Sequence, residues 1–405
     1  MTAIAKTCIT AHSGAILSRN GYGLYTNPFR GFGRGRVRFQ FDDPTYDPTT
    51  SPLGYKTGAH WEHVCSEPNI WDYWREATDW SYEFGGVSYD AEAKIQSPCS
   101  VLIANLEGIT DIIGMFYLCT KIHDVYNFYA PDATGVEHVF DYCSGVRTFD
   151  IVSMESATSY YRTFANCTSM TKAPMFIISR SATGLSGMQY MFYGCSSLVN
   201  VPLYDTSMVT DFRGMFGKCT SLEHVPELDT GSATLMSDMF QGCSSLVDVP
   251  EFDTSNVGNM QSMFSNCRSL EYVPLFDTAN VKVMTNMFAY CESIESVPLF
   301  NTASVENFTG MLFECSSLKH IPLFDTSSCG ATGYGYTNCT AMCSGCVSVE
   351  SGALDLYNQW ITQSEGHPYP STQYQNTFKN CGINTVTGLA ELQQIPTSWG
   401  GLKEE

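Results

Sequence analysis

Apolar residues recur along the middle of the chain with a period of 24 residues, most regularly over residues 191–326. The copy that begins at Met239 reads MFQGCSSLVDVPEFDTSNVGNMQS, and the following copy reads MFSNCRSLEYVPLFDTANVKVMTN. The apolar positions stay apolar from copy to copy, whereas several positions between them change. This pattern is typical of repeat arrays, in which each unit buries its apolar face only against its neighbours.

Each copy predicts the same short elements. Residues 246–249 have the pattern of a short strand with Leu246 and Val249 inward, and Pro250 ends it because proline has no N–H to donate. Residues 253–256 are turn and cap formers. Met260, Met263 and Phe264 then follow at the i, i+3, i+4 spacing of a short helix. The sequence therefore predicts an α/β solenoid with one short strand and one short helix in each repeat.

Cysteine follows the same period. Eleven of the 17 cysteines share one position of the repeat, and seven of the ten steps between them are 24 residues. They are Cys119, Cys143, Cys167, Cys195, Cys219, Cys243, Cys267, Cys291, Cys315, Cys346 and Cys381. A residue that recurs in this way stacks on its own copies, so we expect small, buried, reduced thiols rather than a disulfide framework.

The consensus MFxxCxSLxxVPxFDTSxVxxM resembles the bacterial-surface-protein type of leucine-rich repeat, also called the BspA-like repeat. The resemblance is specific over residues 191–326, degenerate over 115–190 and weak over 327–405. Such repeats occur in surface proteins of Bacteroidetes, in mycoplasma lipoproteins and in proteins of their phages. The resemblance implies a leucine-rich-repeat array with an adhesive or binding role, and it names no ligand.

The repeat pattern divides the chain into three expected domains. Residues 1–98 lack the period, hold four of the six tryptophans and are expected to form an N-terminal anchoring or assembly domain, with a short helix at 69–76. Residues 99–326 are expected to form the solenoid, which opens with a strand at 99–106. Residues 327–405 are expected to hold irregular repeats and a cap.

Charge is distributed unevenly. The net charge is −20, which argues against nucleic-acid binding by the whole chain, yet residues 1–41 hold six basic residues and no acidic one. One interpretation is that this basic arm docks an acidic surface of a partner. The alternative is a turn-rich loop whose arginines are simply solvated. The candidate anchoring residues are Arg30, Arg34, Arg36 and Arg38.

Recognition is expected on the strand face of the repeats. Two positions between the inward leucine and valine vary from copy to copy, as a binding surface on a constant core requires. The alternative is that these positions vary because nothing constrains them. The candidate binding residues are Asn200, His224, Asp248, Glu271, Tyr272, Lys319 and His320.

Metal binding and catalysis receive little support. Cys329, Cys339, Cys343 and Cys346 form a weak zinc candidate, because their spacing is unlike that of common zinc sites, and the alternative is a set of ladder, loop and core thiols. An aspartate column from Asp205 to Asp325 is better explained by turn capping than by calcium. No catalytic motif is present, so we expect a non-enzymatic protein without a cofactor.

The first residues do not form a signal peptide, and no apolar run reaches the roughly 18 residues that span a bilayer. We therefore expect synthesis in a host cytoplasm, no membrane insertion and no bound nucleic acid. The expected function is that of a virion protein, a phage fibre or capsid-decoration protein. Its N-terminal region would bind other virion proteins, its repeats would bind a host surface protein or glycan, and a homo-oligomer is compatible with this role. The alternative is a bacterial cell-surface adhesin.

Overall fold

A computed structural model describes most of the chain. The described residues are 14–16, 25–27, 34–50, 55–63, 69–88, 92–177, 187–329, 339–363 and 374–404. They belong to two compact units, unit 1 (residues 1–185) and unit 2 (residues 186–405), and each unit is described by itself.

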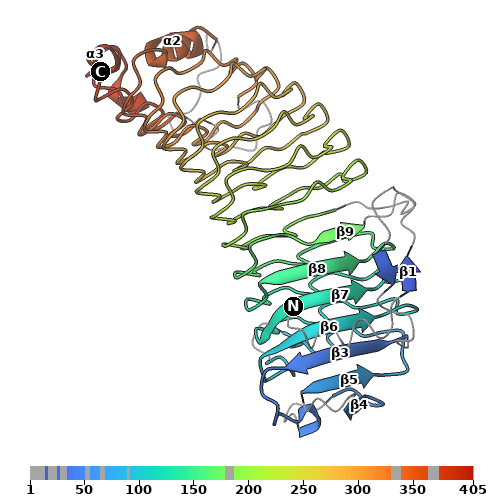
Figure 1. Ribbon diagram of the computed structural model, residues 1–405. Helices are drawn as coiled ribbons and strands as arrows, with labels where there is room; N and C mark the ends of the chain where they lie inside the picture. The colour runs from blue at the N-terminus through green and yellow to red at the C-terminus, as the bar shows by residue number, and fades with distance from the viewer. Residues whose placement is uncertain are drawn as a thin grey trace. The chain divides into compact units, whose positions relative to one another are not determined.

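Unit 1 is built on a mixed seven-stranded sheet with the order β4-β5-β3-β6-β7-β8-β9 (Figure 1). The strands are β3 (Arg36–Phe41), β4 (His60–His63), β5 (Ile70–Trp74), β6 (Cys99–Asn105), β7 (Ile122–Tyr129), β8 (Thr148–Ser153) and β9 (Met175–Ile177). The pairs among β4, β5, β3 and β6 are antiparallel, and the pairs from β6 to β9 are parallel. A separate hairpin joins β1 (Gly14–Ile16) to β2 (Tyr25–Asn27), and a 3-10 turn, η1, covers Pro48–Thr50.

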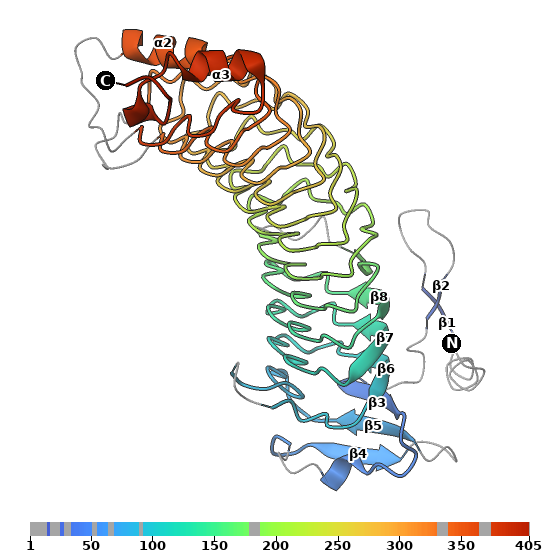
Figure 2. The same ribbon diagram turned by 90° about the vertical axis from the view of Figure 1, so that its left-hand side faces the viewer.

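Two expectations for unit 1 are settled by this sheet. The strand predicted at 99–106 is confirmed as β6, which is buried along its whole length. The helix predicted at 69–76 is wrong, because residues 70–74 form β5 and pair with β3 and β4 (Figure 2). Trp71, Tyr73 and Trp74 are aromatic residues that favour strands, and a partner strand on each side satisfies the backbone of β5.

Unit 2 consists of stacked repeats followed by short helices. Parallel bridges link each repeat to the next at 24-residue steps, from Gly187 through Asp211, Leu235, Asn259 and Val283 to Asn307. Regular helices follow at α2 (Ala353–Gln363) and α3 (Val386–Leu392), and a 3-10 turn, η2, covers Thr397–Trp399. At the C-terminal end the N–H of Phe378 donates to the carbonyl of Trp399 at 2.9 Å, so this turn pairs with the last repeat.

The predicted α/β solenoid is wrong. Over residues 187–329 the chain forms turns and isolated bridges, with neither a regular strand nor a helix. Among the described residues, regular structure comprises the β1–β2 hairpin, the mixed sheet of unit 1, the helices α2 and α3, and the 3-10 turns η1 and η2 (Figure 1).

Left-handed residues explain why the predicted helix does not form. Ser262 and Asn266 have φ angles of 52° and 62°, and corresponding positions of the other repeats also have positive φ. A right-handed helix cannot pass through a left-handed residue. The N–H of Phe264 therefore donates outward to the carbonyl of Met287 in the following repeat, at 2.9 Å, instead of along a helix.

The core of unit 2 is made of columns of identical or similar apolar side chains. The rings of Phe240 and Phe264 are stacked with centroids 5.7 Å apart, and those of Phe252 and Phe276 are stacked at 6.4 Å. The repeats therefore lie farther apart at the second column than at the first. This wider spacing is found next to Pro250 and its counterparts, which donate no N–H to a neighbour.

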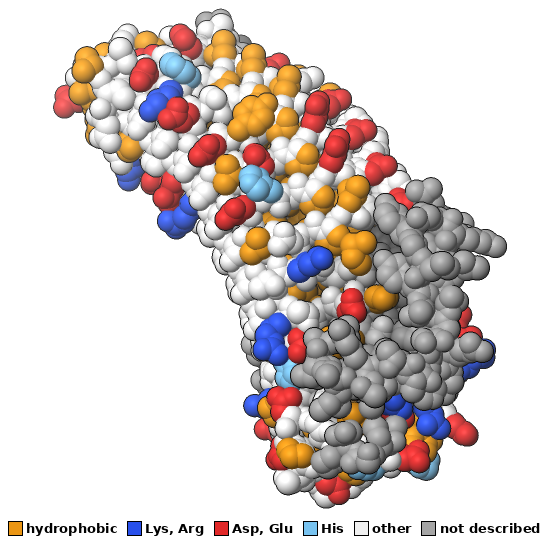
Figure 3. Space-filling view, in the orientation of Figure 1, with side chains coloured by type: hydrophobic (Ala, Val, Ile, Leu, Met, Phe, Trp, Pro, Cys, Tyr) orange, Lys and Arg blue, Asp and Glu red, His pale blue; other side chains and the backbone are white. Residues whose placement is uncertain are grey.

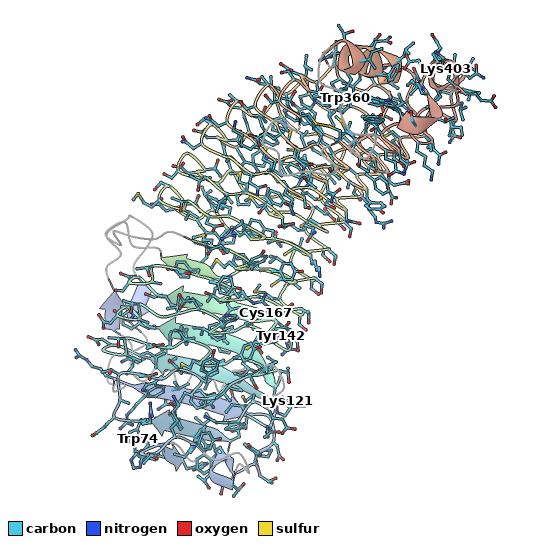
Figure 4. All side chains as sticks on the ribbon, turned by 180° about the vertical axis from the view of Figure 1, so that it is seen from behind. Trp74, Lys121, Tyr142, Cys167, Trp360 and Lys403 are labelled. Carbon is cyan, nitrogen blue, oxygen red and sulfur yellow. A yellow bond between two sulfur atoms is a disulfide. The ribbon has the colours of Figure 1, made fainter. Side chains whose placement is uncertain are left out.

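The thirteen free cysteines of the described residues are all buried, and they include all eleven ladder cysteines. This confirms the expected reduced ladder. The thiol of Cys267 donates to the carbonyl oxygen of Phe240 at 3.1 Å, and the same contact recurs in unit 1 between Cys167 and Phe140 at 3.2 Å (Figure 4). Cysteine at this position is thus both a small apolar side chain and a hydrogen-bond donor.

The compact units do not follow the expected domain boundaries. The chain divides at residues 185 and 186 rather than at 98 and 326, and strands from the N-terminal region share one sheet with β6 to β9. In the part of the chain that the structure describes, no helix is long and apolar enough to cross a bilayer.

Candidate recognition surface

The two variable positions of the repeat are open to solvent in unit 2. They follow the buried leucine column, represented by Leu246, and precede the buried or half-buried valine column, represented by Val249. Of the predicted binding residues, Asn200, His224, Asp248, Glu271, Tyr272 and His320 are exposed and Lys319 is half-buried. The main chain holds these positions in register, since the N–H of Glu271 donates to the carbonyl of Val247 at 3.0 Å.

Two of the candidate residues pair with each other. His224 Nδ1 lies 2.8 Å from the Oδ1 atom of Asp248, its counterpart one repeat later. The hydrogen bond and the charge of Asp248 raise the pKa of His224 above its ordinary value. His320 lies in the same column and contacts the hydroxyl of Ser351 through Nδ1 at 2.8 Å. The structure thus brings His224 and Asp248 together, whereas His320 belongs to a different contact.

A row of exposed leucines lies beside these residues. Leu275, Leu299 and Leu323, here called the leucine row, occupy the position directly after the repeat proline, and each is more than half exposed. The same position holds Leu203, Glu227 and Glu251 in earlier repeats. In Figure 3 apolar side chains gather over the face of unit 2, and acidic side chains lie beside them.

The sequence pattern did not predict the leucine row, because the consensus leaves the position after the proline variable. A signal was nevertheless present: the position holds glutamate in two of the copies and leucine in the others, and a buried position would not accept an unpaired glutamate.

The aspartate column lies on the other side of the leucine row. Asp253 Oδ1 accepts hydrogen bonds from the hydroxyl of Ser255 at 2.7 Å and from its N–H at 3.0 Å, and these bonds lower the pKa of Asp253. Thr254 donates to the carbonyl of Asp277 in the following repeat at 2.7 Å. These contacts agree with the predicted turn capping.

The predicted anchoring arginines are largely engaged within unit 1. Arg38 is buried, and its Nε and Nη2 atoms donate to the two oxygens of Asp72 at 2.7 and 3.0 Å. The guanidinium of Arg36 lies 4.7 Å from the ring centroid of Trp74, which Figure 4 labels. Arg34 forms an exposed ion pair with Glu107 at 2.8 Å, and Arg30 lies outside the described residues. Arg38 is therefore a structural residue that cannot meet a partner.

The four thiols of the weak zinc candidate are not brought together. Cys329 and Cys339 form a disulfide, while Cys343 and Cys346 are free and buried. The thiol of Cys346 donates to the carbonyl of Leu312 at 3.0 Å, as a ladder cysteine does. Among the described residues, no group of three or more histidine, cysteine or acidic side chains is placed to hold a metal ion.

Buried carboxylates in unit 1 have structural partners. Asp141 lies 2.8 Å from Nδ1 of His138 and accepts from Nε of Arg162 at 2.9 Å. Glu83 accepts from the hydroxyl of Tyr73, and Arg75 lies 3.5 Å away. Each carboxylate is thus stabilised by neighbouring donors or cations in the interior.

One known protein family matches the repeats of this chain. A family model described as "Mycoplasma protein of unknown function, DUF285" matches residues 186–295 and again residues 246–349. Searches of curated proteins and of solved structures found no match. The two matches overlap and lie almost entirely within the stacked part of unit 2, so the repeats of this chain are related to the repeats of that family.

Proposed function

We propose that this chain is a non-enzymatic recognition protein whose repeats bind a host surface protein or glycan. The observation that carries the proposal is the contrast between constant and varied columns in unit 2. The cysteine column is buried in every repeat, whereas the column of Asn200, His224, Asp248, Tyr272 and His320 is exposed and changes chemistry at each step. A constant core under a varied face is what a repeat scaffold for recognition requires.

The proposed location is a phage particle, on which the chain would serve as a fibre or decoration protein. The separation of charge supports attachment through the N-terminal region, because residues 1–41 are basic and the rest of the chain is acidic. Arg38 has no part in that attachment, since Asp72 holds it in the interior of unit 1.

A second candidate is a bacterial cell-surface adhesin of the BspA-like type. The family match favours it, because the matching family is described from mycoplasma proteins. The consensus resemblance to BspA-like repeats points to the same class. In both candidates the repeats have the same recognition role. The candidates differ in whether the protein is attached to a phage particle or to a bacterial cell.

Two measurements test the proposal. Mass spectrometry of purified phage particles should detect the protein as a stoichiometric component, whereas detection on the surface of intact bacterial cells would favour the adhesin.

Fluorescently labelled protein should bind host cells, and the double variant H224A/Y272A should bind them at least about tenfold more weakly, as loss of interface contacts predicts. Gln261→Ala is the matched control, since Gln261 is exposed on the methionine and phenylalanine segment of the repeat. Equal binding by all three proteins would contradict recognition through this face.

A further inference from the structure

The leucine row is an apolar feature that the core does not use. Leu275, Leu299 and Leu323 are 62%, 62% and 52% exposed, although the phenylalanine that follows each of them is buried. Tyr272, 59% exposed, lies three residues before Leu275 and extends the apolar area toward the candidate binding column. Contiguous exposed apolar side chains with polar surroundings are typical of protein interaction sites.

The spacing of the leucine row follows from the buried rings beside it. The rings of Phe276 and Phe300, which directly follow Leu275 and Leu299, are stacked with centroids 6.3 Å apart and an interplanar angle of 4°. Because these rings are nearly parallel, the distance between their centroids gives the spacing of consecutive repeats beside the leucine row. Successive leucines are therefore separated by about the distance that separates apolar side chains along one face of a peptide, roughly 5.4 Å per helical turn or 6.8 Å per two extended residues.

Acidic residues border the leucine row on both sides. Glu271 and Glu295 lie on the side of the candidate binding column, and Asp277 and Asp325 lie on the side of the turns. Unit 2 as a whole holds 22 acidic and seven basic residues. A second copy of unit 2 would bring like charges together across this face, whereas a basic partner would pair with them.

We propose that the leucine row binds a cationic amphipathic segment of a partner protein. Apolar side chains of the segment would contact Leu275, Leu299 and Leu323, and its lysines or arginines would pair with the bordering carboxylates. The inference rests on the proposed recognition function and gives it a partner class. An anionic lipid surface is disfavoured by the same carboxylates.

Synthetic peptides test this proposal with the full-length protein. One peptide alternates leucine and lysine, and a second has the same composition with leucines spaced for one helical face. A third replaces every lysine of the better binder with glutamate. Fluorescence anisotropy should show binding of at least one lysine peptide, weaker at high salt, and no binding of the glutamate peptide.

Substitutions of single leucines test whether the peptide binds at the leucine row. Leu299→Ser should weaken binding of the lysine peptide about tenfold, because it interrupts the centre of the row. Leu203→Ser is the matched control, since Leu203 occupies the same repeat position, is 65% exposed and is followed one repeat later by Glu227 instead of leucine. An unchanged melting temperature for both variants excludes misfolding as the cause.

Several outcomes would overturn the proposal. They are equal binding of the glutamate peptide, no binding of either lysine peptide, and equal effects of Leu299→Ser and Leu203→Ser. Sedimentation that shows a dimer dissolved by Leu299→Ser would identify a second copy as the partner instead. Leucine-dependent binding to phosphatidylcholine vesicles would identify a lipid surface. If labelled protein binds host cells but the peptide result is negative, only this inference fails, whereas absence of cell binding contradicts the proposed function.

Discussion

At the scale of single residues, the ladder cysteine combines a packing role with a hydrogen bond. Cys267 is fully buried, and its thiol donates to the carbonyl oxygen of Phe240. We expect Cys267→Ala to lower the free energy of unfolding by about 1–3 kcal/mol, because it removes buried atoms and leaves that carbonyl one donor short. Urea unfolding checks the value, with Gln261→Ala as a control expected to change it by less than about 0.5 kcal/mol. A loss as small as that of the control would show that the thiol is dispensable.

The exposed pair of His224 and Asp248 gives a prediction about pH. The pKa of His224 is raised in the folded state, so its contribution to stability is present below the ordinary pKa of histidine and is lost as the pH rises through the raised value. We expect NMR titration of the imidazole to show the raised pKa and Asp248→Asn to return it toward the ordinary value. An identical titration in the two proteins would contradict the pairing. No large change in stability is expected, because both side chains are exposed.

At the scale of the elements, left-handed residues decide the path of each repeat. Asn266 has a φ of 62°, and its counterpart in the preceding repeat, Gly242, has a φ of 76°. We expect Asn266→Gly to stay within about 0.5 kcal/mol of the parent protein, and Asn266→Val to lose about 1–2 kcal/mol, since a β-branched side chain strains a left-handed backbone. Gln261→Val is the control, because Gln261 is exposed and has no positive φ. Equal losses at the two positions, measured by thermal unfolding, would refute the backbone explanation.

Some features of the repeats can be predicted from the sequence, and others cannot. The 24-residue period, the reduced cysteine ladder and the exposure of His224 and His320 follow from repetition alone, and the structure agrees with them. The helix predicted at Met260 to Phe264 does not form, because the local spacing of apolar residues does not reveal the positive φ of Ser262. Nor does the spacing reveal that the backbone N–H groups donate to carbonyls one repeat away.

Not every residue of the candidate surface and of the predicted anchoring set can be predicted from local sequence either. Arg38 is a predicted anchoring residue, but its partner Asp72 lies 34 residues away on a neighbouring strand. Burial that depends on a distant partner is not visible in a local pattern. The leucine row is not predicted for a different reason: Leu275 and its counterparts occupy a position that the consensus leaves variable, and a variable position carries no expectation of an apolar surface.

At the scale of the whole molecule, the stacked repeats predict which deletions unit 2 tolerates. Backbone hydrogen bonds join each repeat to its neighbours at a fixed offset, as between Met260 and Val283 or Met284 and Asn307. Removal of residues 263–286 deletes one full period and leaves every remaining donor opposite an equivalent carbonyl. Removal of residues 263–274 deletes half a period, so donors would meet apolar side chains and the cysteine column would be broken. We expect the first deletion to unfold cooperatively in urea with a smaller m-value than the parent protein, since less surface is buried, and the second to lack a cooperative transition. If the half-period deletion unfolds as cooperatively as the full-period deletion, hydrogen bonding in register between repeats does not hold unit 2 together.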